Sequence, residues 1–223
     1  MREIALDTET TGFHHKGDDR MVEIGCVEMH TRIRTGKSYH VYLNPQRDMP
    51  AQAQKIHGLS AEFLSDKPLF ADVADEFLEF LGDSPLVIHN AAFDMGFINA
   101  ELKRIARPAL PMDRAIDTVV MARERFPGSP ANLDALCRRF EIDLSVRTLH
   151  GALLDAELLA DVYLELMGGR QSALLLDADT GEQNAERIAV EFAKRKFPVA
   201  EAELQAHEEF LSQIDEPLWK KLA

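Results

Sequence analysis

The stretch LDTETTG, residues 6–12, places two carboxylates directly after an apolar run at residues 4–6. Residues two apart on an extended strand point to the same side, so the side chains of Asp7 and Glu9 are predicted to lie side by side. Like charges that close repel one another unless a cation lies between them or a proton is shared. The alternative is a strand that frays into a polar turn and ends at Gly12. Short motifs occur by chance, so the rest of the chain has to distinguish the two.

The bulk composition is that of a globular protein. The chain has 223 residues, of which 46% are apolar and 28% charged, and this size suits one medium domain with an extra segment. The net charge of −13 argues against a protein that grips nucleic acid by clustered Lys and Arg alone. It does not exclude a nuclease, because bound divalent cations reverse the local sign of a carboxylate cluster.

The sequence predicts a cytoplasmic protein. Nothing at the N-terminus resembles a signal peptide, and no apolar run approaches the length that crosses a bilayer. Cys26 and Cys137 are far apart in the sequence and lie in apolar surroundings. We therefore expect both cysteines to be reduced and buried.

Strands dominate the start of the chain and helices follow. Strand-like runs lie at residues 2–7, 21–30, 37–43 and 85–90, and helical periodicity lies at residues 70–81, 93–105, 117–126, 132–140 and 151–167. This order predicts an α/β sheet covered by helices, within a domain of residues 1–169 that ends at two glycines. Residues 170–185 are predicted to be a linker, and residues 186–223 a helical tail.

Three further residues have the chemistry to act with the first two carboxylates. Asp94 follows a short strand at the start of a predicted helix, His150 precedes another, and Asp155 lies within the apolar stripe of that second helix. A carboxylate on an apolar face is costly unless it is paired or bound to metal. Taken singly, Asp94 could be a helix cap, and His150 a cap or a loop histidine.

Taken together, these residues suit metal-dependent phosphodiester hydrolysis. Carboxylate oxygens are preferred ligands of Mg²⁺ and Mn²⁺. A histidine, with an ordinary pKa of about 6.5, suits a general base that acts on water. Two cations about 4 Å apart stabilise the attacking and leaving oxygens of an in-line displacement.

The motifs resemble those of a known family. Asp7-x-Glu9, the segment HNAAFD that ends at Asp94, and His150 with Asp155 five residues later are similar to the three motifs of the DEDDh 3′→5′ exonucleases. Within that family, LDTETTG, IHGL, VIHNAAFDMGF, FPG with LDALC, and LHGALLDAELLADVY resemble the proofreading epsilon subunits of bacterial DNA polymerase III. The resemblance covers nearly the whole chain and is weakest in the linker. It implies a ribonuclease H-like mixed sheet flanked by helices, with a C-terminal linker and helical tail.

The resemblance also implies roles for individual residues. Two Mg²⁺ or Mn²⁺ ions would be held by Asp7, Glu9, Asp94 and Asp155, with His150 as the general base. The terminal nucleotide would be contacted by Thr10, His57, Asn90 and Phe93. Thr10 belongs to the turn with Thr11 and Gly12, where a glycine lets the backbone approach a ligand closely. The sequence departs from the family at Gln52, where proofreading subunits carry a glutamate.

The implied substrate is a single-stranded or mispaired 3′ end of DNA, which would lose nucleoside 5′-monophosphates. Apolar stripes in the tail that have no core to fill indicate a partner surface. The resemblance implies that this partner is the polymerase III catalytic (alpha) subunit. The stripes are Ile188, Phe192 and Phe197, followed by Leu204, Phe210, Leu211 and Ile214. The segment QSALLL, Gln171–Leu176, resembles a sliding-clamp-binding peptide, although a chance apolar patch is about as common there. Whether a small theta-like subunit also binds is left open.

Three other functions are weighed against proofreading. An RNA 3′-end trimming nuclease, such as an oligoribonuclease or ribonuclease T relative, would share the chemistry but would not need the tail. A tethering subunit with a vestigial nuclease site is opposed by the intact set of four carboxylates and His150. A phosphatase with an aspartate nucleophile requires a second aspartate where Glu9 stands.

Overall fold

The computed structural model describes residues 1–145, 147, 149–169 and 199–214. Its contacts divide the chain into two units, Met1–Leu176 and Asp177–Ala223. The first unit contains the sheet and the helices that cover it, and the second contains α8 (Glu201–Ser212). The predicted linker, the segment Gln171–Leu176 and the stripe of Ile188, Phe192 and Phe197 lie outside the described residues.

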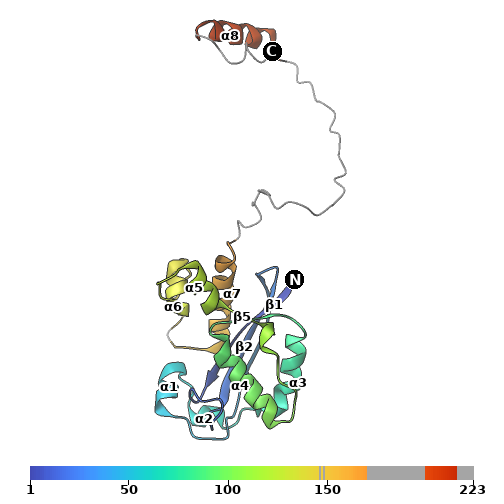
Figure 1. Cartoon of the computed structure of the whole chain (residues 1–223), viewed down its shortest axis with the longest axis vertical. Helices are drawn as coiled ribbons and strands as arrows, with labels where there is room; N and C mark the ends of the chain where they lie inside the picture. The colour runs from blue at the N-terminus through green and yellow to red at the C-terminus, as the bar shows by residue number, and fades with distance from the viewer. Residues whose placement is uncertain (146, 148, 170–198, 215–223) are drawn as a thin grey trace. The chain divides into compact units, whose positions relative to one another are not determined.

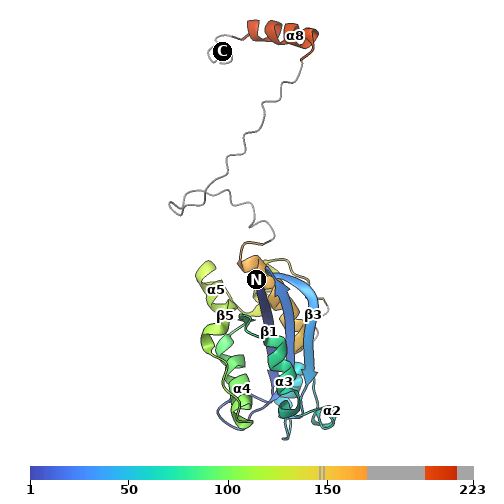
Figure 2. The same ribbon diagram turned by 90° about the vertical axis from the view of Figure 1, so that its right-hand side faces the viewer.

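One mixed sheet of five strands forms the centre of the first unit. The strands are β1 (Arg2–Thr10), β2 (Met21–His30), β3 (Ile33–Tyr42), β4 (Leu86–Ile88) and β5 (Ala115–Asp117). They lie in the order β3-β2-β1-β4-β5, and Figure 2 shows β3 and β5 at opposite edges. The pairs β1–β2 and β2–β3 are antiparallel, whereas β1–β4 and β4–β5 are parallel. The predicted mixed sheet is therefore confirmed.

Strand β1 is in the middle of this sheet, and both of its faces are covered. Ile4 and Leu6 belong to the core cluster under α3 and α4, whereas Ala5 belongs to the cluster under α5, α6 and α7. Because side chains alternate along a strand, Asp7 and Glu9 share the side of Ala5. The chain thus directs both carboxylates towards α7.

Helices cover the two faces of the sheet (Figure 1). One face is covered by α3 (Phe70–Leu81) and α4 (Ala91–Arg104), and the other by α5 (Thr118–Arg125), α6 (Leu133–Arg139) and α7 (Ala152–Leu166). These five helices agree with the predicted ones to within a few residues. The apolar stripe predicted for α3 is buried, since Phe70, Ala74, Phe77 and Leu81 are at most 2% exposed.

Some elements were not predicted. The chain between β3 and α3 contains α1 (Ala51–His57) and α2 (Ala61–Leu64), and a 3₁₀ turn (Met112–Arg114) precedes β5. Strand β3 begins four residues earlier than expected, at Ile33 rather than Lys37. Asp117, predicted as the start of a helix, ends β5 and caps α5 through hydrogen bonds from the backbone N–H groups of Val119 and Val120.

The structure bears on two further predictions, which concern the cysteines and membrane-spanning segments. Cys26 and Cys137 are buried free thiols, as expected. Within the described ranges, no helix has the length and apolar character needed to span a membrane.

Candidate active site

The approach of α7 to the sheet depends on a glycine in β2. Gly25 is opposite Asp7 in the β1–β2 register. A Cβ atom at Gly25 would lie 2.2 Å from the backbone carbonyl carbon of Ala152, the first residue of α7. Any larger residue would push the helix away, because the obstacle is backbone rather than a flexible side chain. Gly25 therefore allows the start of α7, with Asp155 in its first turn, to lie against the end of β1.

Asp94 is hydrogen-bonded to β1 at Thr8, the residue between Asp7 and Glu9. Its Oδ1 accepts hydrogen bonds from the backbone N–H of Thr8 at 3.0 Å and from the Thr8 hydroxyl at 2.7 Å. The helix that carries it is fixed at its first residue, where Ala91 N–H donates to Asp117 Oδ2 at 2.9 Å. Asp94 is 2% exposed. Thr8, which sequence reasoning did not single out, thus ties α4 to the strand of Asp7 and Glu9.

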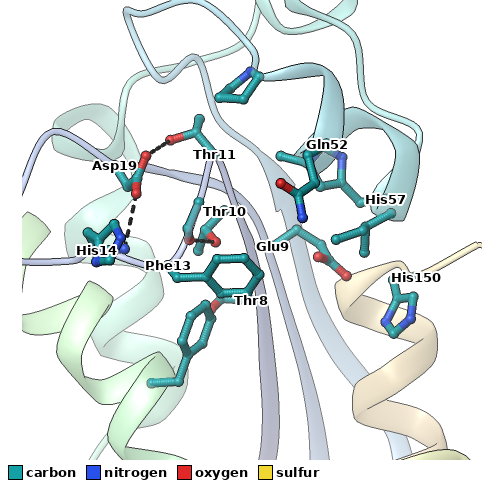
Figure 3. A pocket seen from close by; sticks show the side chains of 15 residues that line it. Thr8, Glu9, Thr10, Thr11, Phe13, His14, Asp19, Gln52, His57 and His150 are labelled. Atoms are coloured by element: carbon teal, nitrogen blue, oxygen red, sulfur yellow. Dashed lines mark hydrogen bonds between the residues drawn. The ribbon is translucent and has the colours of Figure 1, made fainter.

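A second group forms where β1 meets α7. One ligand atom from each of Glu9, His150 and Asp155 lies within 4.8 Å of the other two. Glu9 and Asp155 are 9% and 3% exposed, whereas His150 is exposed. Figure 3 shows Glu9 and His150 facing the same part of a pocket from different elements. The structure brings together residues that are more than 140 positions apart in the sequence.

Arg147 was missed by the sequence analysis. Its Nε and Nη2 donate to Asp155 Oδ1 and Oδ2, each at 2.6 Å, and its Nη2 lies 2.9 Å from His150 Nδ1. Its Nη1 also reaches Asp134 Oδ1 on α6, at 2.5 Å. A bidentate pair of this kind fixes the orientation of a carboxylate. Arg147 lies only three residues before His150, but this spacing does not indicate its contacts with Asp134 and Asp155.

The carboxylates affect one another's protonation. Burial, followed by the charges of Asp94 and Glu9, raises the pKa of Asp7 well above its ordinary value. Burial, followed by Asp155 and Glu23, raises the pKa of Glu9 to about 8. Burial also raises the pKa of Asp94 to about 7, although the hydrogen bonds from Thr8 act against it.

Asp155 is the exception within this cluster. Burial acts to raise its pKa, but the hydrogen bonds from Arg147 and His150 outweigh burial and lower the pKa. Three of the four carboxylates are thus destabilised as anions and one is neutralised by an arginine. A cation would relieve the repulsion in the same way. The cluster is a candidate acidic metal site.

A pocket of about 570 Å³ opens beside this cluster (Figure 3). Its lining residues come from β1 and the loop after it, from α1 and from the starts of α4 and α7: Thr8, Glu9, Thr10, Thr11, Gly12, Phe13, His14, Asp19, Pro50, Gln52, Ala53, Ile56, His57, Phe93 and His150. The predicted nucleotide-contacting residues Thr10, His57 and Phe93 are among them, and so is Gln52. Asn90 is not, and lies at the N-cap of α4 with φ of 68°.

His57 is buried in the wall of this pocket. It is 5% exposed, and its Nδ1 accepts a hydrogen bond from the backbone N–H of Leu59 at 3.0 Å. Burial lowers the pKa of His57, so the neutral imidazole is favoured. The unpredicted helix α1 is the element that places His57 and Gln52 beside Glu9.

Residues 4–163 match the RNase_T family model, which describes exonucleases. The chain belongs to this exonuclease family. The membership was predicted from the motifs and is confirmed, and the matched residues include the carboxylate cluster, His150 and the pocket.

The exonuclease is also similar to curated proteins over nearly its whole length. It is 53% identical to DNA polymerase III subunit epsilon of Rickettsia felis, a match that covers 96% of this chain and 97% of that protein. It is 44% identical to DNA polymerase III subunit epsilon of Escherichia coli, with 98% and 97% covered. The predicted likeness to epsilon subunits is therefore confirmed.

Solved structures confirm the ribonuclease H-like exonuclease fold. Exonuclease X in complex with 5′ overhanging duplex DNA is 28% identical, with a TM-score of 0.57 over 74% of this chain and 90% of that one. The nuclease domain of 3′hExo, a DEDDh family member bound to rAMP, has a TM-score of 0.64 at 15% identity, with 74% and 91% covered. At that identity the second comparison bears on the fold alone.

Proposed function

We propose that this exonuclease is the proofreading subunit of a bacterial DNA polymerase III and removes mispaired nucleotides from DNA 3′ ends. The observation that carries the proposal is the close approach of Glu9, His150 and Asp155 beside a pocket of about 570 Å³, with Asp94 hydrogen-bonded to Thr8 on the strand that also carries Asp7. The two similar epsilon subunits support the same function. The reaction is hydrolysis of the terminal phosphodiester, which releases a nucleoside 5′-monophosphate and leaves a new 3′-hydroxyl.

The four carboxylates suit two divalent cations, Mg²⁺ or Mn²⁺. Their chemistry fits because all four offer oxygen ligands, and the pKa values of Asp7, Glu9 and Asp94 are raised where an uncompensated cluster would repel itself. When bound, such cations would activate water and stabilise charge on the attacking and leaving oxygens. Glu9 and Asp155 are the carboxylates beside His150.

The protein's own side chains supply the remaining tasks. His150 is exposed at the edge of the cluster, from where its imidazole can accept the proton of the attacking water. Thr10, His57 and Phe93 line the pocket and would hold the terminal nucleotide, with the ring of Phe93 available for stacking on the base. Asn90, at the start of α4, would contact the substrate only beyond the lining of this pocket.

The proposal extends to partners and location. We assign the tail to binding of the polymerase III catalytic (alpha) subunit, and Gln171–Leu176 to a weak contact with the sliding clamp. A small theta-like subunit is an additional candidate partner. A chain with net charge −13 binds DNA weakly by itself, so tethering to the polymerase would supply the 3′ end at high effective concentration. With these partners, the exonuclease would act in the cytoplasm, at the replisome.

The substrate preference tests this function. With Mg²⁺, we expect faster release of deoxynucleoside 5′-monophosphates from a mispaired primer end than from a paired one, and none in excess EDTA. A mismatch has already lost the stacking and pairing that must be broken before the end enters the site. Timed gel assays on matched primer-template, mismatched primer-template and RNA measure this. Equal rates on both primers, or faster cleavage of RNA, would contradict proofreading.

A second prediction concerns His150. We expect His150→Ala to lower kcat by about 10²- to 10⁴-fold, the usual contribution of general base catalysis, and to remove the acid limb of the pH–rate profile. Mn²⁺ binding, measured by calorimetry, should persist because the four carboxylates remain. His207, exposed on α8, gives a matched control, and His207→Ala should be fully active. An unchanged rate and profile for His150→Ala would exclude it as the base.

A further inference from the structure

The segment that carries His150 is joined to helix α1. The backbone N–H of His150 donates to the carbonyl oxygen of Ile56 at 3.2 Å. Ile56 belongs to the last turn of α1, where backbone carbonyl groups have no partner within the helix. Both residues line the active-site pocket. The hydrogen bond therefore connects two walls of the pocket that come from distant parts of the chain.

The side chain of Leu149 adds an apolar contact beside this hydrogen bond. A Cβ atom at Gly58 would lie 2.7 Å from Cδ1 of Leu149, so the leucine lies directly against the backbone of that glycine. Gly58 ends α1 with φ of 79°, and its lack of a side chain leaves the space that Leu149 fills. Leu149 is 49% exposed and belongs to neither core cluster. Its contact is thus made at the edge of the active site rather than in the core.

Helix α7 alone does not fix the position of His150. Gly151, the N-cap of α7, separates the two, and a glycine adopts many backbone conformations. The His150 side chain is 50% exposed, and its Nδ1 atom contacts Arg147 and Asp155. Those contacts orient the ring, whereas the contacts with α1 hold the backbone. Position matters here, because a general base must lie within about 2.6–3.2 Å of the group whose proton it takes.

We propose that Leu149 is a positioning residue for His150. By packing on Gly58, its side chain keeps the His150 amide within hydrogen-bond distance of Ile56, and so keeps the imidazole at the edge of the carboxylate cluster. Leu149 is not among the residues that line the pocket. It therefore acts on the reaction through His150 rather than by contact with the nucleotide. The inference rests on the proposed function, in which His150 accepts the proton of the attacking water.

Turnover by the full-length protein tests this role. On a single-stranded oligodeoxynucleotide with Mg²⁺, Leu149→Ala should lower kcat roughly tenfold, because a misplacement of about 1 Å can cost about 10²-fold. KM, and Mn²⁺ affinity measured by calorimetry, should stay within about twofold of wild type, because no lining residue and no carboxylate changes. Leu149→Met should restore nearly full kcat, since methionine can fill the same space over Gly58.

The His150→Ala background separates positioning from a structural role. In that background, Leu149→Ala should change kcat by less than about twofold, because a residue that acts through His150 has nothing left to position. Met112, 51% exposed and outside the pocket lining, provides the matched control, and Met112→Ala should keep wild-type kinetics. A similar loss of kcat in both backgrounds, an equal loss in the control, or an unchanged kcat for Leu149→Ala alone would each overturn the inference.

Hydrogen exchange gives a readout that does not depend on turnover. The amide proton of His150, followed by NMR in the metal-free protein, should exchange with solvent at least roughly tenfold faster in Leu149→Ala, because its hydrogen bond to Ile56 opens more often. An unchanged exchange rate would show that the leucine does not hold this segment, and the inference would be wrong. If the wild type releases no nucleotide from DNA, or if His150→Ala is fully active, the proposed function fails instead, so the two failures are distinguishable.

Discussion

Asp7→Asn is expected to lower kcat for nucleotide release by at least ~100-fold, while the protein without metal keeps its fold. Loss of a residue that only supports metal ligands costs roughly 10- to 100-fold, so loss of a ligand itself should cost more. In the absence of metal, the same substitution is expected to stabilise the folded protein. Burial, Asp94 and Glu9 already disfavour the Asp7 anion, and the neutral amide removes that repulsion.

The pH dependence of stability gives the sign of this effect. A carboxyl whose pKa is higher in the folded state binds more protons when folded, so its contribution to stability is lost as pH rises. With Glu9 at a pKa of about 8 and Asp94 at about 7, the loss extends from about pH 4, the ordinary carboxyl pKa, to about pH 8. In EDTA, Asp7→Asn should therefore raise Tm by a few degrees at pH 8.5 and by less at pH 5.5.

Asp161 provides the control for this experiment. It belongs to α7, as Asp155 does, but its side chain is 39% exposed and pairs with Arg34 at 3.4 Å. Asp161→Asn should leave both turnover and Tm nearly unchanged, because exposed pairs contribute little. A large fall in Tm of Asp7→Asn in EDTA would show that Asp7 is structural. Full activity of that variant would remove it from the metal site.

The elements that could be predicted are those in which apolar residues recur at the regular spacing of a buried strand or helix face. Strand β1 and helices α3 and α7 have apolar residues at the spacing of their contacts with the core, so their place in the fold could be read from residues alone. Helix α1 has no such stripe, because only Ala53 and His57 of its seven residues are buried. Strand β5 has three residues, too few to show alternation.

The candidate site likewise contains residues that could be predicted from the sequence and residues that could not. Asp7 and Glu9 could be placed together because strand geometry is local, and Asp94 and Asp155 because they begin helices next to the sheet. The contacts of Arg147 with Asp134 and Asp155 depend on how α6 and α7 pack, and no spacing rule predicts them.

Truncation after Gly169 should abolish co-purification with the polymerase catalytic subunit while activity on free single-stranded DNA stays within about twofold of wild type. Both core clusters of the first unit are drawn from residues 4–167, with no member from residues 199–214. Helix α7 ends at Leu166, and Gly168 and Gly169 adopt positive φ of 106° and 70° that ends the helix. The exonuclease domain should therefore fold without the tail.

Helix α8 lets the same prediction be tested in the full-length chain. Leu204 and Phe210 are 51% and 59% exposed, and apolar side chains of this size on a helix surface suit a groove on a partner. Leu204→Ser/Phe210→Ser should weaken polymerase binding at least ~10-fold, because each buried apolar side chain contributes about 1.5–3 kcal/mol. Glu203→Gln/Glu208→Gln, on exposed positions of α8, is the control and should bind normally. If the serine variant still binds fully, docking does not use α8, and if the truncated protein unfolds, the tail belongs to the core.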